Sequence, residues 1–190
     1  DVGVNAANPR PLNEFGHIIE LTEDDATARR FRWNVFLLAG DPRVPGTTFF
    51  SKYEDLAKNR LFAPDVYFGG QSNAAGVSPI ACPDNLGIDP HGRLWIVTDT
   101  DDKRLAHNGC YVCPTEGPER GALEQIMSAP AGAEVCGCEF TPDGTTLFLS
   151  IQHPGEGGTL DEPASHWPDG GDLPPRSALI AVRRKDGDPV

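Results

Sequence analysis

The chain has 190 residues and a formal net charge of -12. The acidic balance argues against nucleic acid and anionic membrane surfaces as partners, and no apolar run is long enough to span a membrane. With 21 glycines and 18 prolines, the composition favours turn-rich β structure over helices. The length suffices for one sizeable core, so we expect residues 1–190 to form a single domain.

Apolar residues alternate with polar ones in a series of short segments, which is the pattern of half-buried β-strands. Residues 1–15 are polar and predict a loop, and residues 155–175 predict a long exposed loop. A short helix is expected at most once, within residues 53–62. The predicted strands are residues 16–21, 30–38, 65–68, 109–114, 123–129, 134–140, 147–151 and 177–183, together with a hairpin over 82–100.

The hairpin over residues 82–100 is the most informative stretch of the chain. Asp89-Pro90-His91-Gly92 supplies its turn, because proline fixes φ and glycine can take a positive φ. Asp84 and Asn85 lie where the first strand begins, and Asp99 lies where the second strand ends. An antiparallel hairpin brings these two ends together. Oxygen ligands of this kind suit hard cations such as calcium.

A weaker copy of this hairpin lies about 50 residues downstream, a spacing that is typical of propeller blades. Its turn is Thr141-Pro142-Asp143-Gly144, and its second strand leads into Gln152-His153-Pro154. Gln152 therefore corresponds to Asp99. The sequence predicts an all-β fold, a β-propeller or partial propeller with about three to four blades in this chain.

The five cysteines leave three interpretations open. Cys110-x-x-Cys113 followed by Cys136-x-Cys138 could form a four-thiolate zinc site, although the second pair has only one intervening residue. Disulfides between neighbouring strands and buried free thiols are the alternatives. The odd count, completed by Cys82, prevents full pairing within the chain.

Several motifs occur in one order along most of the chain, from Asn8 to about Lys185. They are Asn8-Pro9-Arg10, Gly16–Glu20, Phe36–Pro42, Ser78-Pro79-Ile80, Cys82–Leu86, Leu94–Asp99, Phe140–Gly144 and Ile151–Glu156. Together they resemble the C-terminal half of PhoX-type alkaline phosphatases.

The resemblance implies a bacterial β-propeller phosphatase that is exported by the twin-arginine route, hence periplasmic or secreted. Its members hydrolyse phosphate esters at a site containing calcium and iron. The iron-binding cysteine of the family belongs to the N-terminal half, outside this chain. We therefore expect the remaining propeller half, or self-association, to cover the open edges of the sheets.

A phosphatase site needs carboxylates at strand ends that hold cations near the phosphoryl oxygens. The candidate metal ligands are Glu20, Asp84, Asn85, Asp99 and Glu134. Possible donors to the phosphate are Arg10 and His17, and His17 could instead be a packed core residue. The motif His153-Pro154-Gly155-Glu156 is expected to shape a loop near the site or to be a structural turn. The sequence assigns no catalytic residue.

Three functions remain open from the sequence. The first is a metal-dependent phosphatase, or a fragment of one that is inactive by itself because the thiolate iron ligand lies elsewhere. The second is a non-catalytic propeller module; Thr100, where the family often has glycine, and the lack of a lysine before Ser78 favour it. The third is a calcium-dependent, lactonase-like hydrolase. No phosphate-binding glycine loop or serine nucleophile elbow is present.

Overall fold

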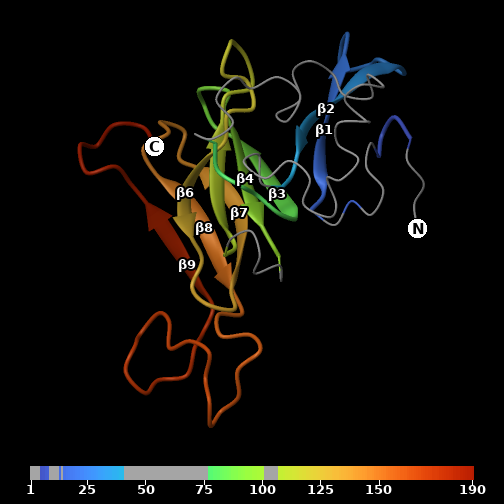
Figure 1. The fold of residues 1–190 in the computed structure, drawn as a ribbon. Coiled ribbons are helices and arrows are strands. Elements are labelled where there is room, and N and C mark those ends of the chain that lie inside the picture. The colour runs from blue at the N-terminus through green and yellow to red at the C-terminus, as the bar shows by residue number, and fades with distance from the viewer. Residues whose placement is uncertain (1–4, 9–12, 14, 41–76, 101–106) are drawn as a thin grey trace.

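The computed structural model describes residues 5–8, 13, 15–40, 77–100 and 107–190. Every regular element in this part of the chain is a β-strand, and the strands form three antiparallel sheets (Figure 1). The all-β prediction is therefore confirmed. The predicted helix within residues 53–62 and the strand at 65–68 lie outside the described residues.

The first sheet is a two-stranded hairpin of β1 (His17–Glu23) and β2 (Phe31–Leu38), as the alternation predicted. One face of this hairpin is apolar and exposed, because its side chains follow the period of two along both strands. These side chains are Ile19, Leu21, Phe31 and Trp33. The second half of β2 is buried and enters the core.

The second sheet has four strands in sequence order, and the third sheet has three. Both β4 and β5 are buried along their whole length, because they are the central strands of their sheet. The long segment between β8 and β9 extends away from the sheets (Figure 1). The strands are β3 (Pro83–Ile88), β4 (Leu94–Thr98), β5 (Gly109–Cys113), β6 (Glu124–Ser128), β7 (Glu134–Phe140), β8 (Leu147–Gln152) and β9 (Ala178–Val182).

Asp89 organises the turn of the β3–β4 hairpin from a buried position. Its carboxylate accepts hydrogen bonds from the Arg93 guanidinium at 2.6 Å and from the Trp95 indole N–H at 2.9 Å, as well as from two backbone N–H groups. Trp95 in turn lies edge-on to Phe140 of β7, with ring centroids 5.3 Å apart. The buried carboxylate of Asp89 thus joins the predicted turn to the core.

The third sheet packs against the second through β7, which contacts β3 and β4. The approach is close at Gly87, where an added Cβ would lie 2.7 Å from the Cβ of Cys138. Only glycine fits there, since real Cβ atoms do not come so close.

The first sheet joins the second through backbone hydrogen bonds and one ion pair. Gly40 and Ile80 exchange both of their backbone hydrogen bonds, and the Cys82 N–H donates to the Phe15 carbonyl. In the middle of β1, both carboxylate oxygens of Glu20 accept hydrogen bonds from the Arg120 guanidinium, which also lies over the ring of Phe36.

We predict that Asp89→Asn destabilises the protein by about 2–4 kcal/mol, because Arg93 loses its buried partner. Burial alone would raise the pKa of Asp89, but the hydrogen bonds from Trp95 and Arg93 outweigh it and hold this pKa below its ordinary value. The folded state thus favours the ionised form, and its contribution is present above about pH 4 and lost as the pH falls further. Urea unfolding from pH 7 to pH 2.5 measures both effects. An unchanged acid dependence in the variant would contradict this role.

We predict that Gly87→Ala costs about 1–3 kcal/mol, because the new methyl group pushes β7 away from β3. Chemical denaturation measures this cost. The control is Ser128→Ala at the exposed end of β6, where we expect a change within about 0.5 kcal/mol. An exposed glycine such as Gly117 would not serve, because its φ of 78° makes an alanine there strained. Equal effects of the two substitutions would contradict the close packing.

Candidate metal centre

Three side chains meet at one end of the second and third sheets: Asp99, Glu134 and His153. One potential ligand atom from each lies within 4.8 Å of the other two. Asp99 directly follows β4, Glu134 opens β7, and His153 directly follows β8. The cluster is thus assembled from strand ends on both sheets.

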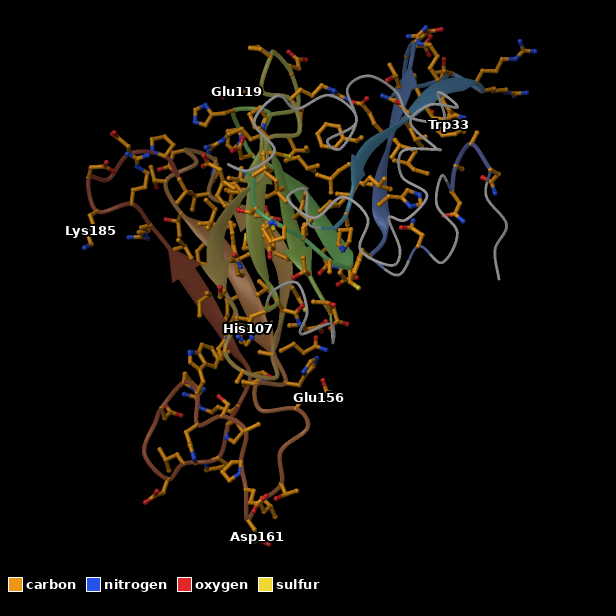
Figure 2. The ribbon with its side chains drawn as sticks, viewed as in Figure 1. Trp33, His107, Glu119, Glu156, Asp161 and Lys185 are labelled. Atoms are coloured by element: carbon orange, nitrogen blue, oxygen red, sulfur yellow. The ribbon has the colours of Figure 1, made fainter. Side chains whose placement is uncertain are left out.

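Figure 2 places His107 and Glu156 toward this end of the molecule and Glu119 at the opposite end. Asp99, His107, Gly132, Ala133, His153 and Glu156 line a cleft here with a volume of about 530 Å³. The cluster is therefore open to a small molecule on one side.

The Glu134 carboxylate is buried, with 8% of its side chain exposed, and its Oε1 lies 3.6 Å from His153 Nε2. The other ring nitrogen of His153, Nδ1, lies 3.1 Å from the Gly132 carbonyl oxygen and 3.1 Å from Glu156 Oε2. Both neighbours of Nδ1 are acceptors, so Nδ1 carries a proton. In the neutral ring, Nε2 then presents a lone pair to a carboxylate oxygen, an arrangement that calls for a cation or a second proton between them.

The pKa of His153 reflects this surrounding of acceptors. Burial by itself lowers it, but the Gly132 carbonyl and the carboxylates of Glu156 and Glu134 together raise the pKa above its ordinary value. His153 also has a positive φ of 36°, which is rare for residues other than glycine. The turn after β8 therefore holds this imidazole in place against Glu134.

The Cys136 thiol lies beside Glu134 and within the influence of further acidic side chains. It donates to Glu134 Oε1 at 3.2 Å and lies 3.6 Å from Gln152 Oε1. Burial, the hydrogen bond to Glu134 and the charges of Glu134, Asp84 and Asp99 raise the pKa of this thiol to about 12. Next to it, Asn85 Oδ1 accepts a hydrogen bond of 3.0 Å from the Gly137 N–H.

Four of the five predicted metal ligands therefore lie in one neighbourhood: Asp84, Asn85, Asp99 and Glu134. Glu20 does not join them. Its carboxylate binds Arg120 at 2.7 Å, in the β5–β6 loop, which lies at the other end of the second sheet from Asp99. Its metal-binding role stays a prediction.

Of the two predicted phosphate donors, Arg10 lies outside the described residues. His17 opens β1, and its Nδ1 accepts a hydrogen bond of 2.6 Å when Asn13 Nδ2 donates. The neighbouring Gly16 lies against Pro83, at the end of the hairpin that carries Asp99. This placement leaves the predicted role of His17 open.

Asn108 is a positioning residue that the sequence analysis did not single out. Its Oδ1 accepts from the Thr100 N–H at 2.6 Å, and its Nδ2 donates to the Ala133 carbonyl at 3.0 Å. These two partners are direct neighbours of Asp99 and Glu134. The buried amide of Asn108 thus fixes the spacing of the two carboxylates, and no sequence pattern predicted this role.

The four-thiolate zinc site is not formed. Cys110 and Cys113 face opposite sides of β5, since Cys113 packs into one core cluster and Cys110 into the other. The odd spacing of three residues puts the two thiols on opposite faces of a strand. All five cysteines are free thiols. Of the zinc site, the disulfides and the free thiols that the sequence left open, the structure therefore contains the free thiols.

Comparisons with known proteins show which family the chain belongs to. The family described as "Alkaline phosphatase PhoX" matches residues 2–155 of the chain. The chain belongs to the PhoX family. A search of curated proteins gave no match.

The chain is also similar to a solved structure of Pseudomonas fluorescens PhoX in complex with vanadate, a transition state analogue. The sequence identity is 32% and the TM-score is 0.72, over 97% of this chain and 29% of that one. The chain thus spans less than a third of the length of this relative. Among the described residues of our chain, no helix is long and apolar enough to cross a membrane.

We predict that Asn108→Ala lowers the free energy of unfolding by about 2 kcal/mol, because the Thr100 N–H and the Ala133 carbonyl lose a buried partner. Urea denaturation in the presence of a chelator measures this loss. Asn85→Ala is the matched control. Its single hydrogen bond is exposed, so we expect a loss below about 1 kcal/mol. Similar losses for the two variants would contradict a special role for Asn108.

Proposed function

We propose that this chain is part of a metal-dependent phosphatase of the PhoX type, which hydrolyses phosphate esters. The observation that carries the proposal is the convergence of Asp99, Glu134 and His153, beside a cleft that Asp99 and His153 line. Membership in the PhoX family supports it, as does the similarity to a PhoX bound to a transition state analogue.

The donor set fits the metals that the family implies, calcium and iron. Carboxylate and amide oxygens from Asp84, Asn85 and Asp99 suit calcium. The imidazole of His153 suits iron. The carboxylate of Glu134 is a donor that either metal accepts. When bound, such cations neutralise the phosphoryl oxygens and stabilise the charge that develops on them.

The residues of this chain hold the candidate metal ligands in place and orient them. Glu134 is buried, and a buried carboxylate is stabilised by a cation beside it. Gly132 and Glu156 bind Nδ1 of His153 and direct Nε2 toward Glu134. Asn108 keeps Asp99 and Glu134 at a fixed spacing, and the cleft beside them admits an ester.

We further infer that the three sheets are successive blades of a β-propeller and that residues 1–190 form one propeller-like part of a longer one. The sheets have two, four and three described strands, and four is the usual number in a blade. The hairpins β3–β4 and β7–β8 both end at the candidate metal ligands Asp99, Glu134 and His153, as matching strands of neighbouring blades would.

The remaining propeller half, or a second copy of the chain, is the proposed partner. The exposed apolar face of the first sheet, with Leu21 59% and Phe31 54% exposed, supports such a contact. A periplasmic or secreted location follows from the family alone. The test of the partner is the mass in solution of this chain, by itself and with the rest of the family domain.

We predict that the chain binds a divalent cation and that Glu134→Gln weakens this binding at least tenfold, because it removes the buried charge. Calorimetric titration with calcium and with ferrous iron, together with elemental analysis, measures the affinity. Glu139→Gln, an exposed position on the same strand, is the control and should bind as the wild type does. Absence of any metal binding by the wild type would overturn the proposed centre.

We predict that the 190-residue chain alone does not hydrolyse p-nitrophenyl phosphate, because the family's thiolate iron ligand lies outside it. The longer protein should hydrolyse this ester, and Glu134→Gln should abolish the activity. Metal binding without hydrolysis by the longer protein would instead indicate a non-catalytic module. Hydrolysis of lactones in place of phosphate esters would indicate the lactonase-like function.

A further inference from the structure

Asn108 and Gly109 form the dipeptide of this chain that loses ammonia most readily. Among the eight asparagines of the sequence, only Asn108 is followed by glycine. Asparagine is thermolabile because the backbone nitrogen of the next residue can attack its side-chain amide carbon, and glycine has no side chain to hinder this attack. Gly109 opens β5, and Asn108 lines the cleft beside the candidate metal centre.

The packing of the fold requires both members of this reactive pair. The Asn108 side chain accepts from the Thr100 N–H at 2.6 Å and donates to the Ala133 carbonyl at 3.0 Å. A Cβ at Gly109 would lie 2.4 Å from the carbonyl oxygen of Met127, so only glycine fits there. The position that fixes the spacing of the candidate ligands is thus also the least durable one chemically.

The folded chain restrains both of the groups that would react. The Gly109 N–H, whose nitrogen would be the nucleophile, donates to Thr98 Oγ1 at 3.0 Å. The same hydroxyl group donates to Asn108 Oδ1 at 3.3 Å. Thr98 and Asn108 are both buried. The hydrogen bonds to Thr98 must therefore break before the Asn108 side chain can turn toward the Gly109 nitrogen.

We propose that Asn108 is a deamidation site that Thr98 holds unreactive in the folded chain. When the hydrogen bonds to Thr98 break, the Gly109 nitrogen loses its proton and forms a bond to Cγ of Asn108. The bond from Cγ to Nδ2 breaks, and ammonia leaves with that proton. Water then opens the succinimide ring at either carbonyl carbon and leaves aspartate or isoaspartate. The net change replaces ammonia by water, without oxidation or reduction.

Either product disturbs the surroundings of the candidate metal centre. In aspartate, a carboxylate oxygen takes the place of Nδ2 and has no proton to donate to the Ala133 carbonyl. The new negative charge is also buried. Isoaspartate lengthens the backbone by one carbon atom, so β5 cannot keep its register with both β4 and β6. The modification therefore loosens the strand ends that Asn108 holds.

The experiment compares the reaction of Asn108 in the folded and in the denatured chain. The chain is aged in mildly alkaline buffer, without urea and with enough urea to unfold it. Peptide mass spectrometry then measures the change from amide to acid at each asparagine. In urea, Asn108 should react faster than the other seven asparagines. In the folded chain, Asn108 should react at least about tenfold more slowly than in urea, because only molecules that open locally can react.

Two threonine variants test the restraint by Thr98. Thr98→Val removes the hydroxyl group and should raise the rate at Asn108 in the folded chain by about fivefold or more. Thr146→Val is the matched control, because Thr146 is equally buried and its hydroxyl group accepts from Arg183 in the third sheet. It should change this rate by less than about twofold. In urea, all three proteins should react at the same rate.

Three results would overturn the proposal. They are equal rates at Asn108 in the folded and denatured chain, a rate at Asn108 in urea no higher than at the other asparagines, and equal rates in folded Thr98→Val and Thr146→Val. The unaltered chain decides the first two, even if a variant fails to fold. The measurement involves no metal and no activity, so its outcome is independent of the proposed function.

Discussion

The packing of β7 against the β3–β4 hairpin is the constraint on which the candidate centre depends. It is close because Gly87 has no side chain and Cys138 fills the space. Since Asp99 belongs to one sheet and Glu134 to the other, neither sheet could form the cluster by itself. The stability of this interface and the geometry of the site are therefore set by the same contacts.

A second constraint is the charge buried at this interface. Glu134 is almost inaccessible to water, yet its described neighbours are a thiol and an imidazole, with no arginine or lysine. Asp89 is equally buried, but it has Arg93 and Trp95 as donors. The contrast separates a structural carboxylate, which is satisfied within the chain, from one whose environment favours an added cation.

The two ends of the second sheet differ in function: one joins the first sheet, and the other lies beside the cleft. At one end, Arg120 joins Glu20 and Phe36, and so fixes the first sheet to the β5–β6 loop. At the other end, strand termini from two sheets surround the cleft. A location at strand ends is suitable for ligands, because the backbone there is free to leave the sheet while the strands hold it rigidly.

The sequence by itself determined the described strands and the turn at Asp89, because period-two alternation and turn residues act locally. It also predicted Asp84, Asn85, Asp99 and Glu134 as metal ligands, and the structure places these four near one another. It expected the motif that begins at His153 to shape a loop near the site or to be a structural turn, and it did not single out Asn108. It also grouped Glu20 with residues from which the structure separates it. These relations include contacts between residues that are 21, 25 and 100 positions apart in the chain. Only the tertiary structure could decide them, because they depend on how one sheet packs against another.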